Sequence, residues 1–462
     1  MFVSARRPSP LSPPSVASCL KSNRHRFSLS TIAMLPEDHP QRRELNDEVH
    51  ARPPGVLRAP ARISYLALVS SAESRDEEWR RVSALAAERG VAAPAARVNH
   101  FSADLGGFTL RFERHAEFAR YMFVAQGAGD DPFDPPALAS VPDGFIAGLP
   151  GRVIVAAHGA FLPAEDGADA GNFEALASRW FDGNALVGST VGDGVATALT
   201  DFRIRADGFS RFLVVDHHAT PRQAGRIAQR VLEIDTYRMM ALLALPIARD
   251  LNPFFADCEH ELSQVTLVLE SAGHEDEAIL LDRLTRLEAQ IEVRAAENDY
   301  RFAAAAAYYD LVRRRIAELR ERRIPGLQTF EEFTERRLAP AMNTCRTSAD
   351  RQELLSQRVA RANQLLATRV DITREKQNQD LLESMNRRGK AQLKLQQTVE
   401  GLSVAAVTYY VVGLIGHVVG GVEELGYHVA PEVVMAVSIP IIAGLAAIGI
   451  NRIRHAVVRK AR

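Results

Sequence analysis

The chain has 462 residues, which is enough for more than one folded unit. Its 47% hydrophobic and 24% charged residues are ordinary for globular proteins, and its formal net charge of -1 excludes a global electrostatic attraction to nucleic acid. The three cysteines lie too far apart for a zinc or redox motif, and their odd number suits no disulfide framework, so we expect a reducing compartment and no nucleic-acid partner.

The first residues differ in composition from the rest of the chain. Residues 1–33 contain several arginines, serines and prolines but no Asp or Glu, which is typical of a disordered leader or a transit peptide. A second interpretation is that translation begins at Met34, because patterned sequence starts directly after it. We favour the later start.

Residues 34–250 are predicted to form a folded body with strands and helices. Residues 62–70 are typical of a buried strand, residues 76–89 of a helix, and residues 107–114 alternate as a half-buried strand does. A long helix is expected to begin after Thr220, with Pro221 at its first position, and to continue to residue 248. The body is therefore α+β or α/β, with its strand order open. Further strands are predicted at residues 152–156, 185–190, 197–204 and 211–215.

A polar cluster is predicted at strand ends of this body. The segment HPQRRELNDEVHARPP, residues 39–54, gathers Asp47, Glu48, His50 and Arg52 ahead of two prolines. Histidine and carboxylates are metal ligands and arginine binds anions, so the cluster is a candidate ligand site. Structural roles are the alternative, because no spacing matches a metal motif such as HExxH. The same cluster is expected to include Asn99, His100, Glu113, His115, Glu117 and His217.

No catalytic residue is assigned. Arg111, Glu113, His115 and Glu117 alternate along one predicted strand face, which a solvated face explains equally well. Asp216 and the two histidines after it follow a strand but lack a Ser or Cys nucleophile elbow. Residues 188–194, GSTVGDG, lack the lysine of a phosphate loop and are interpreted as a hairpin turn. We therefore favour a protein that is not an enzyme, and an enzyme that uses residues 39–54 together with His100 and His115 is kept as an alternative. The sequence identifies no cofactor.

Residues 251–400 are predicted to be almost entirely helical. One helix covers residues 275–323, breaks at Pro325 and Gly326, and is followed by a short helix through Phe330. From residue 351 onwards apolar residues recur at helical spacing into the first apolar segment, although residues 371–380 are polar all round. An antiparallel helical bundle and a homo-oligomeric coiled-coil stalk both explain this pattern.

Two C-terminal segments are candidate transmembrane helices. Residues 402–422 contain no charged side chain and approach the roughly 20 apolar residues that span a bilayer, and residues 433–450 form a second uncharged run. The alternative is one buried hairpin in a soluble core. Basic residues flank both spans and the link between them is acidic, so we expect an inner-membrane protein with both termini cytoplasmic. The expected order is a leader (1–33), a body (34–250), a helical stalk (251–400), a first span (401–422), a periplasmic loop (423–432), a second span (433–451) and a basic tail (452–462).

Small residues within the two spans indicate close helix packing. Gly416 and Gly420, like Ala443 and Ala447, are four residues apart, a spacing that lets helix backbones approach closely in lipid. Association of several copies through these faces and packing within one hairpin are equally compatible with the pattern. The expected partners are therefore the lipid bilayer and further copies of the chain.

Five segments spread along the chain are HPQRRELNDEVHARPP, LRFERHAEF, YRFAAAAAYYDLVRRRIAEL, RLAPAMNTC and QLKLQQTVEGLSVAAVTYY. Together they resemble the domain-of-unknown-function 3422 family of bacterial membrane-anchored proteins. The resemblance extends from about Glu37 to the C-terminus and implies a membrane-anchored protein, without implying a reaction.

The order of parts also resembles that of CorA-type divalent cation channels. Their Gly-Met-Asn signature is missing, since Gly420, Gly421 and Val422 stand before Glu423. A ring of Glu423, Glu424 and Glu432 from several copies would attract cations, so a cation channel or transporter is the alternative function. The first expectation is a non-enzymatic membrane protein whose cytoplasmic body binds a ligand or a partner.

Overall fold

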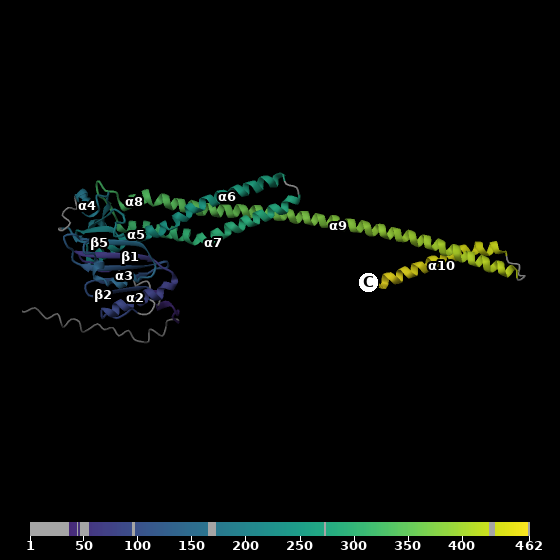
Figure 1. The fold of residues 1–462 in the computed structure, drawn as a ribbon, viewed down its shortest axis with the longest axis horizontal. Helices are drawn as coiled ribbons and strands as arrows, with labels where there is room; N and C mark the ends of the chain where they lie inside the picture. Colours follow the sequence, from purple (N-terminus) through teal and green to yellow (C-terminus); the bar gives the residue numbers. More distant parts are fainter. Residues whose placement is uncertain are drawn as a thin grey trace, which may run out of the picture. The chain divides into compact units, whose positions relative to one another are not determined.

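The computed structural model describes residues 37–43, 45–46, 55–94, 98–164, 172–271, 274–424 and 430–460 (Figure 1). The predicted leader lies outside these residues. The chain divides into two compact units, of which the first comprises Met1–Leu243 and Ala304–Asn343 and the second Ala244–Ala303 and Thr344–Arg462. The sheet body thus takes part of its structure from a stretch that follows it by some sixty residues.

The first unit is built on a mixed sheet of nine strands in the described residues, in the order β2-β3-β4-β1-β5-β8-β7-β6-β9. β1 lies between β4 and β5 and is antiparallel to both, whereas β5 and β8 are parallel. The predicted α+β composition is confirmed. The strands are β1 (Ala61–Val69), β2 (His100–Asp104), β3 (Thr109–Arg114), β4 (Phe118–Gln126), β5 (Arg152–Pro163), β6 (Val187–Val191), β7 (Ala196–Thr200), β8 (Ser210–Asp216) and β9 (Arg322–Arg323).

One face of this sheet is apolar and is covered by short helices. Alternate residues of β3 and β4, such as Phe112 and Tyr121, pack against Val82 and Leu85 of α2 (Arg75–Glu88) and against Phe145 of α3 (Asp143–Ala147). Further along the sheet, α4 (Phe173–Trp180) packs on β5, β7 and β8. The period-two alternation of the strands therefore sends one set of apolar side chains to this face and another, which includes Tyr65 and Phe118, to the opposite face.

The opposite face is covered by α5 (Pro221–Leu242). The helix starts as predicted, since Pro221 occupies its first turn and the Gln223 side chain accepts a hydrogen bond from the Thr220 backbone at 3.0 Å. The expected single helix to residue 248 is wrong, because α6 (Ala244–Ser271) follows as a separate helix. Pro246 explains the break, since its nitrogen cannot donate to the carbonyl four residues earlier.

Other predicted turns agree with the structure. A short 3-10 turn, Gly192–Gly194, joins the antiparallel strands β6 and β7, as the hairpin interpretation of this segment requires. α7 (His274–Leu319) ends four residues before its predicted end at residue 323, because Arg322 and Arg323 pair with β6 as β9. α8 (Phe330–Arg337) follows Pro325 and Gly326, and its N-cap Thr329 forms a capping box with Glu332.

The second unit is helical. α6, the first part of α7 and the first part of α9 (Ala339–Glu424) pack around a stripe of buried residues that includes Leu262, Leu284 and Val359. Polar pairs tie the same helices, among them Arg351 with Glu259 at 2.8 Å and Asn363 with Glu288 at 2.5 Å. The antiparallel bundle was one of the two interpretations of this segment. α9 continues for 86 residues in all, and α10 (Pro431–Lys460) follows it.

Candidate functional site

A network of buried charges lies on the α5 face of the sheet. Arg120 of β4 donates from Nε to Glu113 of β3 at 3.0 Å and from Nη1 to Glu233 of α5 at 2.6 Å. The three residues are between 3% and 8% exposed. Because a buried charge without a partner is costly, each of these groups depends on the others for its place in the fold.

The network continues from α5 to α7. Arg315 of α7 donates to the second carboxylate oxygen of Glu233 at 2.5 Å and to Glu318 at 3.0 Å. Arg230 of α5 donates to the same Glu318 carboxylate at 3.1 Å. Alternating guanidinium and carboxylate groups thus join two strands and two helices that are far apart in sequence.

Electrostatics keeps this network ionised. Burial alone would raise the pKa of Glu233, but the guanidinium groups of Arg120 and Arg315 hold it below its ordinary value. For Arg120, burial works toward a lower pKa, and the charges of Glu233 and Glu113 raise the pKa above its ordinary value. A general acid or base needs a pKa near the working pH, so Glu233 and Arg120 are suited to structural support and not to proton transfer.

The chain that follows the predicted polar segment is held next to this network. Arg111 Nη2 donates to the Val56 carbonyl at 3.1 Å, and the Leu57 backbone donates to the Pro221 carbonyl at 2.9 Å. A Cβ on Gly55 would lie 1.5 Å from Arg111 Cζ, and a Cβ on Gly225 would lie 1.8 Å from the Gly55 carbonyl oxygen. The contact at Gly225 is with backbone atoms, so this position of α5 requires glycine, whereas at Gly55 the flexible Arg111 side chain can move aside.

The structure describes some residues of the predicted polar cluster and not others. Asp47, Glu48, His50 and Arg52 lie outside the described residues. His100 of β2 and Glu113 of β3 are register partners, and Glu113 is buried against Arg120, so a solvated face does not explain Glu113.

The remaining members of the cluster lie where strands end. β3 ends at Arg114, so His115 and Glu117 belong to the turn before β4, where the His115 ring stacks on Phe118 at 4.4 Å. His217 Nε2 lies 2.9 Å from Thr197 Oγ1, beyond the end of β8. Within the described part of the chain, no group of three or more His, Cys, Asp or Glu side chains is arranged to hold a metal ion.

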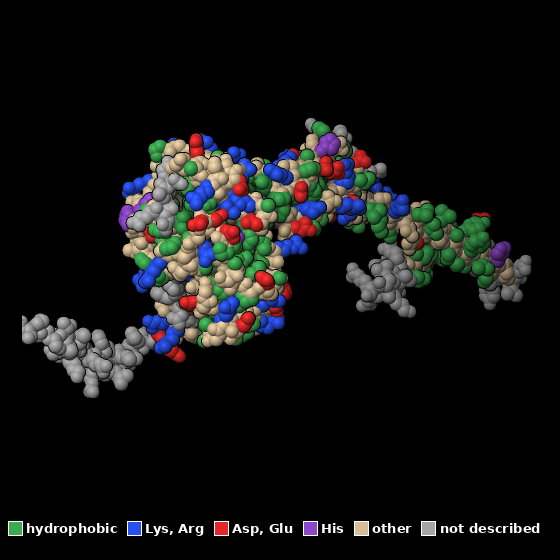
Figure 2. Space-filling view, turned by 60° about the vertical axis from the view of Figure 1, so that its left-hand side comes forward, with side chains coloured by type: hydrophobic (Ala, Val, Ile, Leu, Met, Phe, Trp, Pro, Cys, Tyr) green, Lys and Arg blue, Asp and Glu red, His purple; other side chains and the backbone are tan. Residues whose placement is uncertain are grey.

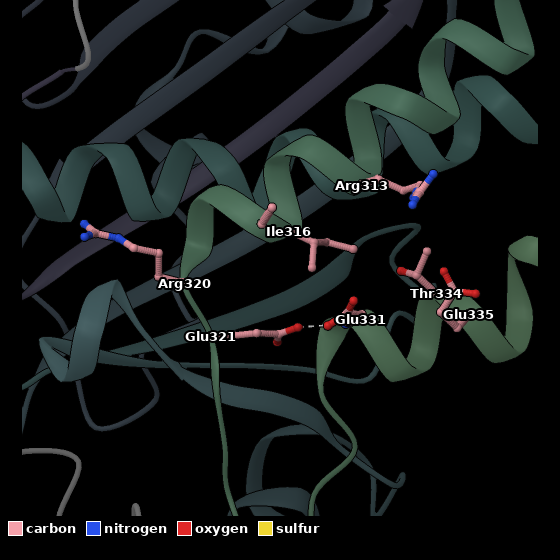
Figure 3. Close-up of a pocket in the computed structure, with 8 residues that line it drawn as sticks. Arg313, Ile316, Arg320, Glu321, Glu331, Thr334 and Glu335 are labelled. Atoms are coloured by element: carbon pink, nitrogen blue, oxygen red, sulfur yellow. Dashed lines mark hydrogen bonds between the residues drawn. The ribbon is translucent and has the colours of Figure 1, made fainter.

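A polar pocket of about 410 Å³ lies between α7 and α8, and sequence reasoning did not identify it (Figure 3). The Glu321 carboxylate accepts hydrogen bonds from the α8 backbone at Phe330 (3.0 Å) and Glu331 (2.9 Å) and from the Ser189 hydroxyl at 2.7 Å. An anion is favoured at such a helix N-terminus, so Glu321 fixes α8 on the sheet. Figure 3 shows Arg313 of α7 across from Thr334 and Glu335 of α8, which gives the pocket walls of both charges.

An apolar groove of about 930 Å³ separates parts of α9 and α10 in the second unit. Ala443 and Glu432 line it, and a Cβ on Gly416 would lie 2.8 Å from Met435 Sδ. Gly416 thus contacts the partner helix of its own hairpin, whereas nothing lies within 4 Å of a Cβ on Gly420, and Ala447 is exposed. Glu423 and Glu424 end α9, and their side chains lie outside the described part of the chain.

Comparison with known proteins identifies a family and no close relative of known activity. No curated protein and no solved structure matches the chain, so the likeness to CorA-type channels stays a prediction without support. The match to a family model covers residues 37–457, almost the whole chain. The chain therefore belongs to the family described as Protein of unknown function (DUF3422).

Proposed function

We propose that this protein is a non-enzymatic protein of the bacterial inner membrane, anchored by a hairpin of two transmembrane helices, with a cytoplasmic body that binds a ligand or a partner. One observation carries the proposal. Two helical stretches, Ala339–Gly421 and Glu432–Ile453, contain windows long and apolar enough to cross a membrane, and only 6% and 0% of these windows is buried in the protein.

The exposed side chains of these stretches explain why a bilayer is the fitting environment. Leu414 is 64% exposed, Val418 66%, Ile441 57% and Leu445 65%. Covering one such side chain is worth about 1.5 to 3 kcal/mol, so their joint exposure to water would be prohibitive. A core helix of a soluble protein would be mostly buried by its own fold. Figure 2 shows hydrophobic side chains covering the surface of this C-terminal segment.

Two hydroxyl groups in the apolar stretches are hydrogen-bonded within their own helix. Thr408 Oγ1 donates to the Val404 carbonyl at 2.7 Å, and Ser438 Oγ donates to the Val434 carbonyl at 2.6 Å. In hydrocarbon no water is present to hydrogen-bond a hydroxyl, so this local bonding meets a requirement of a membrane location.

The charges at the helix ends support an orientation. Arg387, Arg388, Lys390 and Lys394 precede the first apolar stretch, and Arg452 and Arg454 follow the second, whereas Glu432 stands at the start of α10. Positively charged flanks stay in the cytoplasm, so both termini are proposed to be cytoplasmic and the short link periplasmic.

The proposed binding role of the body rests on the pocket between α7 and α8. Its walls carry Arg313 and Arg320 together with Glu331 and Glu335. A site of mixed charge suits a ligand that itself carries both charges, such as a peptide segment or a zwitterionic small molecule. The buried network behind it gives the two helices fixed positions relative to the sheet.

The anchor is tested by extraction of membranes that contain the full chain. The protein is expected to stay in the pellet after alkaline carbonate or high salt and to dissolve only in detergent. A variant with Leu414→Arg and Leu445→Arg is expected to be lost from the pellet, because each charge at mid-membrane costs about 2.5 to 3.5 kcal/mol on insertion. The matched control is Leu365→Arg with Leu393→Arg, which adds the same charges at two exposed positions outside the spans. Release of the unsubstituted protein without detergent would overturn the proposal.

A further inference from the structure

Between the bundle and the first apolar stretch, α9 runs as a helix that no other element packs against among the residues that the structure describes. Figure 1 shows this part of α9 as one continuous helix, and every residue from Arg374 to Val399 is exposed. Large apolar side chains are among them, including Leu381 at 60%, Met385 at 60%, Leu395 at 66% and Val399 at 57% exposure. Isolated helices have little stability in water, and helices in proteins take most of their stability from packing of an apolar face. We therefore expect another helix to cover this face.

The spacing of the face is that of a coiled coil. We define the stalk seam as Leu381, Met385, Arg388, Gln392, Leu395, Val399 and Leu402. These seven positions follow one another at alternating steps of four and three residues, the spacing of the inner positions of a heptad.

Charges avoid this seam. Glu383, Arg387, Lys390, Lys394 and Glu400 all occupy the outer positions of the heptad, and Arg388 is the exception. The positions that flank the seam carry no charge, being Leu382, Ser384, Gly389, Ala391, Gln396 and Thr398. An identical helix can therefore approach the seam without meeting like charges at its edges.

We propose that the stalk seam is a parallel, in-register coiled-coil interface with a second copy of this chain. The second copy is the fitting occupant because two chains anchored in one membrane share their orientation, which places each seam residue opposite itself. The inference rests on the proposed function for this shared orientation. Gln392 then meets Gln392, and a polar side chain at such a position fixes register and favours an identical partner.

Arg388 gives the interface its one unfavourable layer. Two guanidinium groups opposed across a parallel seam repel each other, which limits the affinity. Replacement of Arg388 by leucine is therefore expected to strengthen association, whereas the neighbouring Arg387 points away from the partner and provides a matched control.

Cross-linking of the full chain in isolated membranes tests the geometry. Single cysteines replace Leu395, Val399, Lys394 or Gln397 in a chain with Cys19→Ser, and the parent without an added cysteine is the blank, since Cys258 and Cys345 are buried. Oxidation is expected to give the covalent dimer at least tenfold more readily for L395C and V399C than for K394C and Q397C. Equal yields at the four positions would overturn the proposal, and so would cross-links to a protein of another mass, which would identify a different partner.

Association in detergent, measured by light scattering, provides the second test. R388L is expected to lower the dissociation constant of the copies at least tenfold, and R387L to leave it within twofold. A weaker association of R388L, or equal effects of the two variants, contradicts the seam. Protein that extracts with carbonate but still cross-links at L395C would contradict the anchor alone, whereas protein retained in membranes with no seam cross-link would contradict the seam alone.

Discussion

The sheet body and the stalk seam differ in which side chains are buried: the body buries charged groups, and the seam exposes apolar groups. In the body, charged groups such as Arg120 and Glu233 are buried and find all their partners within the chain. Along the seam, apolar groups such as Leu395 are exposed and find none. The stability of the body is therefore a property of the single chain, whereas that of the seam depends on what surrounds it. Substitutions in the body are therefore expected to change the free energy of unfolding, and substitutions in the seam to change the association of the copies.

The largest expected effect is the loss of a charge from the buried network. Arg120→Met leaves Glu113 and Glu233 buried without their shared guanidinium, which is expected to lower the free energy of unfolding by about 3 to 5 kcal/mol. Denaturation with urea, followed by the fluorescence of Trp79 and Trp180 in the body, measures the change. Arg230→Met, at a guanidinium that is 25% exposed, is the control and is expected to cost about 1 kcal/mol or less. Equal losses in the two variants would mean that burial does not decide the effect.

The next effect is a dependence of body stability on pH through His158. Burial lowers the pKa of His158 to about 4, and the ring stacks on Phe209 at 4.0 Å and shares a hydrogen bond with Ser64 at 3.0 Å. Since the folded-state pKa lies below the unfolded value of 6.5, the unfolded chain binds the proton first as the pH falls. The contribution of neutral His158 to the free energy of unfolding is fully present above pH 6.5. It is lost as the pH falls toward 4, and the whole loss is about 3 kcal/mol.

The comparison of His158 with His158→Gln isolates this group. The difference in unfolding free energy between the two proteins is expected to shrink as the pH falls from 7 to 4, because both chains share every other titrating residue. A difference that stays constant over this interval would show that His158 titrates alike in the folded and unfolded states.

A smaller loss is expected where the chain passes α5. Gly225→Ala places a methyl group against the Gly55 carbonyl, which must shift, at a cost of about 2 kcal/mol. Gly144→Ala is the matched control, because nothing lies within 4 Å of its added Cβ. Alanine favours the helical backbone of α3, so this control is expected to be neutral or slightly stabilising in the same denaturation experiment. An equal loss at the two glycines would exclude the close passage as the cause.

Local signals in the sequence predicted most helices and turns but missed the strands β2 and β4. β1, α2 and the start of α5 were predicted within one or two residues, because each has its own periodicity or cap. β4 is buried almost throughout, as β1 is, but Arg120 interrupts its apolar run, so neither alternation nor a continuous apolar run marks it. Its Arg120 pairs with Glu233 across 113 positions of the chain, and no local pattern carries such a pairing.

The candidate site was predicted less well for the same reason. The sequence singled out Glu113 as a ligand group, whereas the structure pairs it with Arg120 of the strand that was missed. The pocket between α7 and α8 forms because residues 304–343 belong to the same compact unit as the sheet body. No change of composition along the sequence marks these residues as part of that unit. By contrast, the apolar helices were predicted well, since length and absence of charge are read directly from the chain.

The smallest effect on the body is expected from substitutions in the stalk seam, and this sharpens the contrast between the regions. Leu395→Gln removes an apolar side chain that is 66% exposed, so the urea transition of Trp79 and Trp180 is expected to move by no more than about 0.5 kcal/mol. The same variant is expected to weaken association of the copies at least tenfold by light scattering, since it adds a polar layer beside Gln392. Leu393→Gln, at a leucine that is 61% exposed but off the seam, is expected to change neither quantity. If both leucine variants weakened association alike, general hydrophobicity and not the four-and-three spacing would hold the copies together. If Leu395→Gln destabilised the body as well, the two regions would form one cooperative unit, and the exposed seam would contribute to the fold of the single chain.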